Sequence, residues 1–386
     1  MTRKLDALRE KRRKWVEATQ ENDFEDGIKR LLTDLYPDNA HFIYELLQNA
    51  EDPGATTVRF VLSDSAVEFE HDGERLFSLK DVESITSIGS SNKRDDPTSI
   101  GKFGVGFKAV FAYSNTPEIH SGDFHFRIQD LVVPETDGVP CPTLGERNTR
   151  FVFPFDNPKK PKTHAVAEVE RGLRALGDNT LLFLSHIRRI EYVLPDGAEG
   201  SLERIQLDGG RIKIHSRQPG MAEQISHWLR FDEEVEVTDE DGKNKTCRIA
   251  IVYSLAEDKN TSGRLTWRIV SLDRAQVSIY FPAEKETSNL HFHVHAPFAS
   301  TVARDSVRDC VANNVLRDSL AQLAAKSLVA IREHNLLTVG FLAVLPSPED
   351  KLSPFYEPIR EAIVKEFKEA ALVPVRVGGQ GLATRL

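Results

Sequence analysis

The stretch "HFIYELLQNAEDPGATTVRFVL", residues 41–62, predicts a helix followed by a strand. At about 100° per residue, the first part of the stretch places its apolar side chains on one stripe, which we expect to face the core: Phe42, Ile43, Leu46, Leu47 and Ala50. The letters DPGA end this helix, which we place over 39–51. A strand then follows, because apolar and polar residues alternate.

A second stripe of the same helix is polar. Glu45, Asn49 and Asp52 follow one another at i, i+4 and i+7, so a carboxylate, an amide and a carboxylate share one line. One interpretation is the solvated face of an ordinary amphipathic helix. The other is a site for a nucleotide and its metal, because Mg²⁺ prefers oxygen ligands and a carboxylate one turn away can activate water.

Three glycines open the run "IGKFGVGFKAVF", residues 100–111. Gly101, Gly104 and Gly106 have the spacing G-x-x-G-x-G, which is neither a Walker A loop nor a Rossmann fingerprint. A glycine-rich turn that opens a helix can bind phosphate through free N–H groups, although a tight packing turn has the same composition. The polar stretch before it suits a lid over phosphates, with Ser90, Ser91 and Lys93.

Short strands and helices alternate around these motifs in hairpin order, which favours an α+β fold. We expect a strand over 66–73, a helix that begins at Ser78 with Asp81 three residues on, a helix from Gly106, strands at "DFHFRIQDLVV" and "TRFVFPF", and a helix over 165–177. Further on we expect strands over 187–194, 202–217 and 246–254, then helices over 306–333 and 355–371. The last residues predict a strand without its partner, so we expect the chain to be a piece of a longer one.

Composition narrows the function classes. The 386 residues include 50 Lys and Arg against 59 Asp and Glu, a formal net charge of −9, which disfavours nucleic acid as a partner. The three cysteines are far apart, so neither a disulfide framework nor a zinc site is indicated. Without a signal-like or membrane-length apolar run, we expect a cytoplasmic protein without membrane contact.

The order of these motifs resembles the GHKL ATPases, the superfamily of gyrase B, MutL, histidine kinases and the ninety-kilodalton heat-shock chaperone. "LLQNAEDPGA", "HDGERLF", "SIGSSNK" and "SGDFHF" are similar to the sacsin-type branch. The resemblance implies a Bergerat-type two-layer α/β sandwich and a second α/β domain like the transducer or middle domain. It implies four segments: 1–36 as a helical segment and dimerisation strap, 37–157 as the ATP-binding core, 158–345 as the second domain, and 346–386 as the start of a further region.

The resemblance also implies roles for single residues. Glu45 matches the general base, Asn49 the Mg²⁺ ligand and Asp52 an acidic residue near the nucleoside, while Thr149 matches the threonine that closes the adenine pocket. The phosphate loop corresponds to Gly101, Lys102, Phe103, Gly104, Val105, Gly106 and Phe107, and the lid to Ser90, Ser91 and Lys93.

One motif departs from the family. Its usual D-x-G-x-G, whose first Asp reads the adenine amine, is replaced by "HDGER", which places His71, Asp72 and Gly73 at this point. Either Asp72 takes over the adenine contact, or the base is read differently.

Beyond residue 158 the sequence offers three further groups of candidate residues. A basic residue of the next domain often reaches the γ-phosphate in this superfamily, and Lys285, Arg304 and Arg308 are the candidates, with ordinary surface bases as the alternative. His291, His293 and His295 alternate, so they line either a half-exposed sheet surface or a zinc site. Val307, Val311, Val315, Leu316, Leu320 and Leu323 have helical spacing and predict core or dimer packing.

These inferences predict an ATPase that needs Mg²⁺ and turns over slowly. ATP would close a lid, rearrange domains and promote a homodimer, either as a chaperone-like protein or as the switch module of a larger bacterial protein, including one in defence, with an unknown protein client. A nucleotide sensor without hydrolysis is the alternative, motivated by "HDGER". Protein phosphotransfer ranks third, because no helix before residue 39 carries a persuasive phospho-accepting histidine.

Overall fold

The computed structural model describes residues 2–21, 42–87, 106–142, 148–238, 244–259, 265–301, 305–374 and 380–381. Residues 22–36 of the segment expected to be helical lie outside these ranges, as does most of the glycine-rich run. Two compact units divide the chain. The first comprises Met1–Gly177, Leu184–Glu203 and Ser216–Glu223, and the second Asp178–Phe183, Arg204–His215 and Gln224–Leu386. The four segments expected from the sequence stay a prediction.

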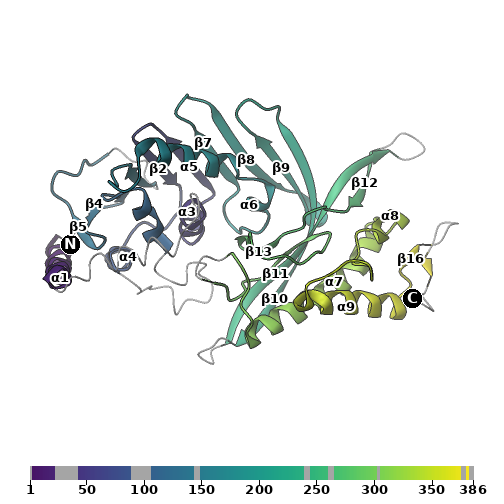
Figure 1. Ribbon diagram of the computed structural model, residues 1–386. Helices are drawn as coiled ribbons and strands as arrows, with labels where there is room; N and C mark the ends of the chain where they lie inside the picture. Colours follow the sequence, from purple (N-terminus) through teal and green to yellow (C-terminus); the bar gives the residue numbers. More distant parts are fainter. Residues whose placement is uncertain are drawn as a thin grey trace. The chain divides into compact units, whose positions relative to one another are not determined.

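A mixed β-sheet covered by helices forms the first unit (Figure 1). Its strands are β1 (Thr57–Leu62), β2 (Ala66–His71), β3 (Glu118–Ser121), β4 (Phe124–Gln129), β5 (Val133–Glu135), β6 (Thr149–Pro154) and β7 (Arg189–Val193). They lie in the order β7-β1-β2-β6-β3-β4-β5, in which β1 and β7 run parallel and the other neighbours antiparallel. The helices are α1 (Thr2–Glu21), α3 (Phe42–Glu51), α4 (Leu79–Ile85), α5 (Lys162–Arg174) and the 3₁₀ helix η1 (Gly106–Ala112).

Helix α3 packs its apolar stripe against the sheet. All five residues predicted for that stripe are 0–1% exposed, which confirms the prediction. Each of the four larger side chains contributes about 1.5–3 kcal/mol by leaving water. Every second side chain of β2 and β6 is buried on the facing side. The Phe42 ring of α3 lies 6.1 Å from the Phe153 ring of β6, centroid to centroid. The residues after α3 lie against the turn that follows β2, where the Glu74 N–H donates to the Pro53 carbonyl at 3.0 Å.

The second unit is built on two long antiparallel strands, β10 (Gln224–Thr238) and β11 (Asn244–Lys259). Helix α7 (Val311–Glu333) packs on both strands and on α9 (Glu357–Glu369), as Figure 1 shows. The hairpin of β8 (Glu199–Gln206) and β9 (Arg211–Arg217) has residues in both units. The remaining elements are α6 (Asp178–Leu182), η2 (Asp208–Gly210), β12 (Leu265–Val270), β13 (Val277–Ile279), β14 (Phe281–Pro282), β15 (His293–His295), α8 (Val339–Leu342), η3 (Pro354–Tyr356), β16 (Val373–Pro374) and β17 (Gln380–Gly381).

Several local predictions are confirmed and others are wrong. The helix at Ser78 begins as expected, because the Asp81 carboxylate accepts the Ser78 N–H at 2.8 Å. The run after Gly106 is a 3₁₀ helix rather than an α-helix, and the strand expected over 202–217 is a hairpin. Strands β3 and β10 were not predicted: β3 has only four residues, EIHS, and β10 carries four charged residues between Asp232 and Glu236.

Burial also corrects two predictions in the second unit. Val311 and Val315 are 81% and 42% exposed, so they do not belong to the core stripe that Leu316, Leu320 and Leu323 form. His293 and His295 are buried rather than half-exposed. No described helix is long and apolar enough to cross a membrane.

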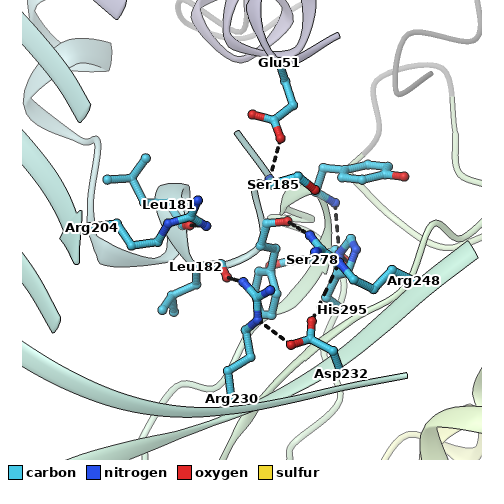
Figure 2. A network of polar contacts seen from close by, with 12 residues as sticks. Glu51, Leu181, Leu182, Ser185, Arg204, Arg230, Asp232, Arg248, Ser278 and His295 are labelled. Carbon is cyan, nitrogen blue, oxygen red and sulfur yellow. Dashed lines mark hydrogen bonds and ion pairs between the residues drawn. The ribbon is translucent and has the colours of Figure 1, made fainter. Parts of the chain in front are cut away.

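The buried carboxylate of Glu51 fixes the end of α3. It is 2% exposed and accepts three consecutive backbone N–H groups, those of Ser185, His186 (2.7 Å) and Ile187 (2.9 Å). Figure 2 shows the Glu51 side chain directed at the Ser185 amide. Directly after this segment, the N–H groups of Arg188 and Arg189 donate to the Thr56 carbonyl, at 2.8 and 3.1 Å, and β7 begins.

Within the second unit, arginines satisfy the C-terminal carbonyls of α6 (Figure 2). Three consecutive carbonyls each accept from a different guanidinium: Leu181 from Arg204 (2.9 Å), Leu182 from Arg230 (2.7 Å) and Phe183 from Arg248 (3.2 Å). The last carbonyls of a helix have no partner within the helix and carry partial negative charge, so cations there are stabilising. This segment is therefore held by strands β8, β10 and β11.

Replacing Glu51 should destabilise the protein. In Glu51→Ala the three buried N–H groups lose their acceptor, and we expect the free energy of unfolding to fall by about 3 kcal/mol or more. Urea unfolding followed by circular dichroism measures the change. The control is Asp64→Ala at the exposed β1–β2 turn, expected within about 0.5 kcal/mol of the native chain. Equal losses in both variants would contradict the role of Glu51.

Buried histidines should make the fold sensitive to acid. Burial lowers the pKa of His293 from 6.5 to about 4, so the native state stays neutral while the unfolded chain takes up a proton below pH 6.5. Stability is then lost as the pH falls from 6.5 towards 4, by about 2 kcal/mol for this group at pH 5. His293→Gln should lose that part of the difference between urea unfolding at pH 7.5 and pH 5. The exposed His164→Gln should keep it, and an unchanged pH dependence in His293→Gln would refute the assignment.

Candidate nucleotide-binding site

The polar stripe of α3 is not a solvated face. Glu45 is 5% exposed, whereas Asn49 and Asp52 are half-buried. A carboxylate on a helix face exposed to water would not be buried to this degree, because removing a charge from water costs free energy. Of the three residues predicted from the sequence, Glu45 and Asn49 lie one turn apart on α3, which Glu51 anchors, and Asp52 lies in the turn directly after the helix.

The ends of β2 and β6 bring His71 and Thr149 together. The strands pair in the register His71↔Thr149, so both side chains lie on the same face at the same end of the sheet. Thr149 is fully buried, and its hydroxyl lies 2.6 Å from the Ser121 hydroxyl of β3. Ser121 also accepts the Phe77 N–H at 3.0 Å. Ser121 was not predicted, since only the register of β3 on β6 places it beside Thr149.

The His71 ring is held by the turn that follows it. Its Nδ1 accepts the Gly73 N–H at 3.1 Å, and the rings of Phe69 and Phe151 lie 5.9 and 6.3 Å away, centroid to centroid. The residue is 4% exposed. Burial lowers the pKa of His71 to about 4, so the ring is neutral at physiological pH.

The Asp72 carboxylate accepts hydrogen bonds from the residues at the start of β1. One oxygen accepts the N–H groups of Thr56 (2.7 Å) and Thr57 (2.9 Å), and the other accepts the Thr56 hydroxyl (2.6 Å). Burial acts to raise the pKa of Asp72, but these hydrogen bonds outweigh it and hold the pKa below its usual value. Asp72 thus ties the end of β2 to the residues that follow α3.

The exit of the glycine-rich run packs into the core. Phe107 is 8% exposed and contacts the rings of Phe111, Phe151 and Phe153. Gly106 begins η1. The other predicted phosphate-loop and lid residues lie outside the described residues: Ser90, Ser91, Lys93, Gly101, Lys102, Phe103, Gly104 and Val105.

A buried lysine that sequence reasoning missed follows Phe107. Lys108 is 1% exposed, and its Nζ donates to the carbonyls of Ile85 (2.8 Å) and Leu131 (2.6 Å). Burial lowers the pKa of Lys108 to about 7. The lysine joins the end of α4 to η1, the two elements on either side of residues 88–105. The sequence feature that could have predicted this burial is the position of the lysine inside the apolar run "GFKAVF".

The basic residues predicted to reach the γ-phosphate from the second unit stay predictions. The Lys285 ammonium lies 2.6 Å from the Asp305 carboxylate, Arg308 has its own polar contacts, and Arg304 is outside the described residues. No group of three or more His, Cys, Asp or Glu side chains in the described part of the chain could hold a metal ion, and the alternating histidines form no such group. A magnesium ion bound through one amide oxygen and phosphate oxygens needs no such group.

Comparison with known proteins identifies the region that carries this site. Residues 21–136 match the family model of the sacsin domain. The predicted resemblance to sacsin-type proteins is thereby confirmed for this sacsin-domain region, which contains α3, β2 and η1. Thr149 lies just beyond it.

Two curated relatives and one solved structure are similar to the chain. Protein NO VEIN of Arabidopsis thaliana is 27% identical over 308 residues, 73% of this chain and 11% of the relative. Human sacsin is 36% identical over 104 residues, 23% of this chain and 2% of its own length. The chain thus spans a small part of both. The B-subunit of DNA gyrase from Myxococcus xanthus aligns with a TM-score of 0.40 and 12% identity, over 89% of this chain and 99% of that one.

The turn at Gly73 should tolerate no side chain. A Cβ atom there would lie 2.9 Å from His71 Nδ1 and 2.9 Å from Pro53 Cγ. We expect Gly73→Ala to lower the free energy of unfolding by about 1–3 kcal/mol, through overpacking. Gly340→Ala is the control, because its Cβ would meet only Thr338 Oγ1 at 3.7 Å. Urea unfolding distinguishes the two, and equal stability of both variants would show that the His71 ring has room to move.

Proposed function

We propose that the chain binds a nucleoside triphosphate with Mg²⁺ and hydrolyses it slowly, with ATP as the nucleotide that the GHKL resemblance implies. The observation that carries the proposal is the buried Glu45, four residues before the half-buried Asn49, on a helix anchored by Glu51. Neither a solvated face nor an apolar core explains a carboxylate and an amide placed in this way. The sacsin-domain match over residues 21–136 supports the same interpretation.

Each polar residue has a role in this proposal. Glu45 takes a proton from the attacking water, whose oxygen bonds to the γ-phosphorus while the bond to the β-phosphate oxygen breaks. The Asn49 amide oxygen would hold Mg²⁺, which when bound neutralises phosphate charge. Asp52 lies one turn further, near the nucleoside. The glycine-rich run from Gly101 to Phe107 would cradle the phosphates.

Lid closure, domain rearrangement and dimerisation belong to the same proposal. Helix α1 is relevant to dimerisation because two of its arginines contact other elements of the first unit. Arg12 donates to the Glu83 carbonyl of α4 at 3.1 Å, and Arg13 pairs with Glu135 of β5 at 2.5 Å. A segment held by such partly exposed charges can exchange them for those of a second copy at little cost. The client and the biological task, chaperone-like or otherwise, are not assigned.

A sensor without hydrolysis is the second candidate. The neutral His71 at the base end favours it, because this position departs from the family's aspartate. The retained Glu45 favours hydrolysis, since a sensor has little use for a base there. The two functions differ in one measurable quantity, which is phosphate release.

Replacing Glu45 should separate binding from hydrolysis. We expect Glu45→Gln to bind the Mg²⁺ triphosphate within about threefold of the native chain, while phosphate release falls by about 100-fold or more, because a general base contributes about 10²–10⁴. Asn49→Ala should lose the Mg²⁺ dependence of binding. Calorimetry and a phosphate-release assay measure both, and Asp64→Asn is the matched control at an exposed carboxylate.

Three outcomes would count against parts of the proposal. If Glu45→Gln releases phosphate at the rate of the native chain, Glu45 is not the general base. If the native chain binds a triphosphate but releases no phosphate, the sensor function is correct and the hydrolysis function is wrong. No binding of any triphosphate rejects the site itself.

A further inference from the structure

We propose that a pocket between α1 and α4 of the first unit binds a small phosphate monoester that carries an apolar group. The two helices lie beside each other, as Figure 1 shows, and residues of both line a pocket of about 580 Å³. No residue of the proposed triphosphate site lines this pocket, so the inference does not depend on that site.

One side of α1 supplies three cations to the pocket. Lys4, Lys11 and Arg12 lie at i, i+7 and i+8, so they share one face of the helix over two turns. Both lysines are exposed, and neither makes an ion pair with a residue that the structure describes. The next residue, Arg13, is instead paired with Glu135 of β5. The pocket therefore holds positive charge that the chain itself leaves without a direct partner.

The Arg12 guanidinium is only partly satisfied. It donates one hydrogen bond, to the Glu83 carbonyl at 3.1 Å, and its Nε is buried without an acceptor among the described residues. Burial lowers the pKa of Arg12, and the nearby Glu83 carboxylate opposes this only in part. A guanidinium has five N–H donors in a planar fork that matches the oxygens of a phosphate. An anion in the pocket would compensate for the burial of this group.

The charges that line the pocket match a dianion. The three cations and the single carboxylate, that of Glu83, leave a formal charge of +2. A phosphate monoester carries about −1.5 to −2 near pH 7 and offers three acceptor oxygens, whereas a carboxylate or a sulfate ester carries one negative charge. The chain as a whole has a net charge of −9, which disfavours a long polyanion such as nucleic acid.

An apolar wall lies beside these charges. Ala7 and Leu8 follow Lys4 by one turn of α1, and Leu79 of α4 lines the same pocket. Pockets of about 300–1,000 Å³ bind small molecules through apolar walls with a few polar groups that fix the orientation. The organic part of a phosphate monoester would cover this wall, which a bare phosphate ion would leave exposed to water.

Calorimetric titration of the whole 386-residue chain with phenyl phosphate, in metal-free buffer near pH 7.5, tests the inference. Phenyl sulfate has a similar shape and one negative charge fewer, and inorganic phosphate has a similar charge without the ring. We expect phenyl phosphate to bind about fivefold or more tighter than either compound, through the second charge and through the apolar wall.

Three variants locate the binding. The double variant Lys4→Gln/Lys11→Gln should bind phenyl phosphate about tenfold more weakly, because it lacks two of the three cations. Glu83→Gln should bind it about threefold tighter, since the opposing charge is gone, and loss of folding cannot imitate this gain. Lys14→Gln is the matched control: this lysine is exposed, pairs with Glu10 and does not line the pocket, so affinity should stay within about twofold.

Each of the following outcomes overturns the inference: no saturable binding below about 10 mM, or a preference below about threefold over phenyl sulfate or inorganic phosphate. So does unchanged affinity in the double lysine variant, an equal loss in Lys14→Gln, or no gain in Glu83→Gln. Binding of a triphosphate with Mg²⁺ should persist in the double lysine variant. Failure of this inference therefore leaves the proposed function standing.

Discussion

The first unit depends on a single buried carboxylate. Glu51 is in the last turn of α3, where the helix dipole disfavours negative charge, and it is almost without contact with water. Three backbone N–H groups of residues 185–187 compensate for both costs. Because these groups directly precede β7, the interaction sets the end of α3 and the start of the parallel β1–β7 pair together. The polar stripe of α3 takes its position from this anchor.

A second set of contacts joins this junction to the end of β2. The Asp72 carboxylate binds the amides that follow α3, and the next residue, Gly73, orients His71 through its own N–H. Asp72, one candidate for the adenine contact, thus has structural partners of its own. The neighbouring His71 has a defined tautomer, because its Nδ1 accepts the Gly73 N–H.

Lys108 is another buried ionisable side chain of the first unit. Its ammonium is shared by carbonyls of α4 and of the β4–β5 connection, where Leu131 has a positive φ of 68°. A buried cation of this kind needs full satisfaction by acceptors. Lys108 therefore joins the end of α4 to η1, the described elements before and after residues 88–105.

The sequence by itself determined the local elements of this protein. The apolar period of α3, the alternation of β1 and β2 and the capping pair at Ser78 and Asp81 all depend on neighbours within a few residues. The motif order also predicted the sacsin-type resemblance. The helical period placed Glu45 and Asn49 one turn apart on α3, because it fixes which side chains share a face.

Only the tertiary structure decided which partners these faces meet. The acceptor role of Glu51 joins residues 134 positions apart, and Ser121 reaches Thr149 only through the register of β3 on β6. Periodicity likewise placed Glu45 on a polar stripe but could not predict its burial. A period specifies the direction of a side chain, whereas burial, tautomer and pairing depend on atoms that distant segments supply.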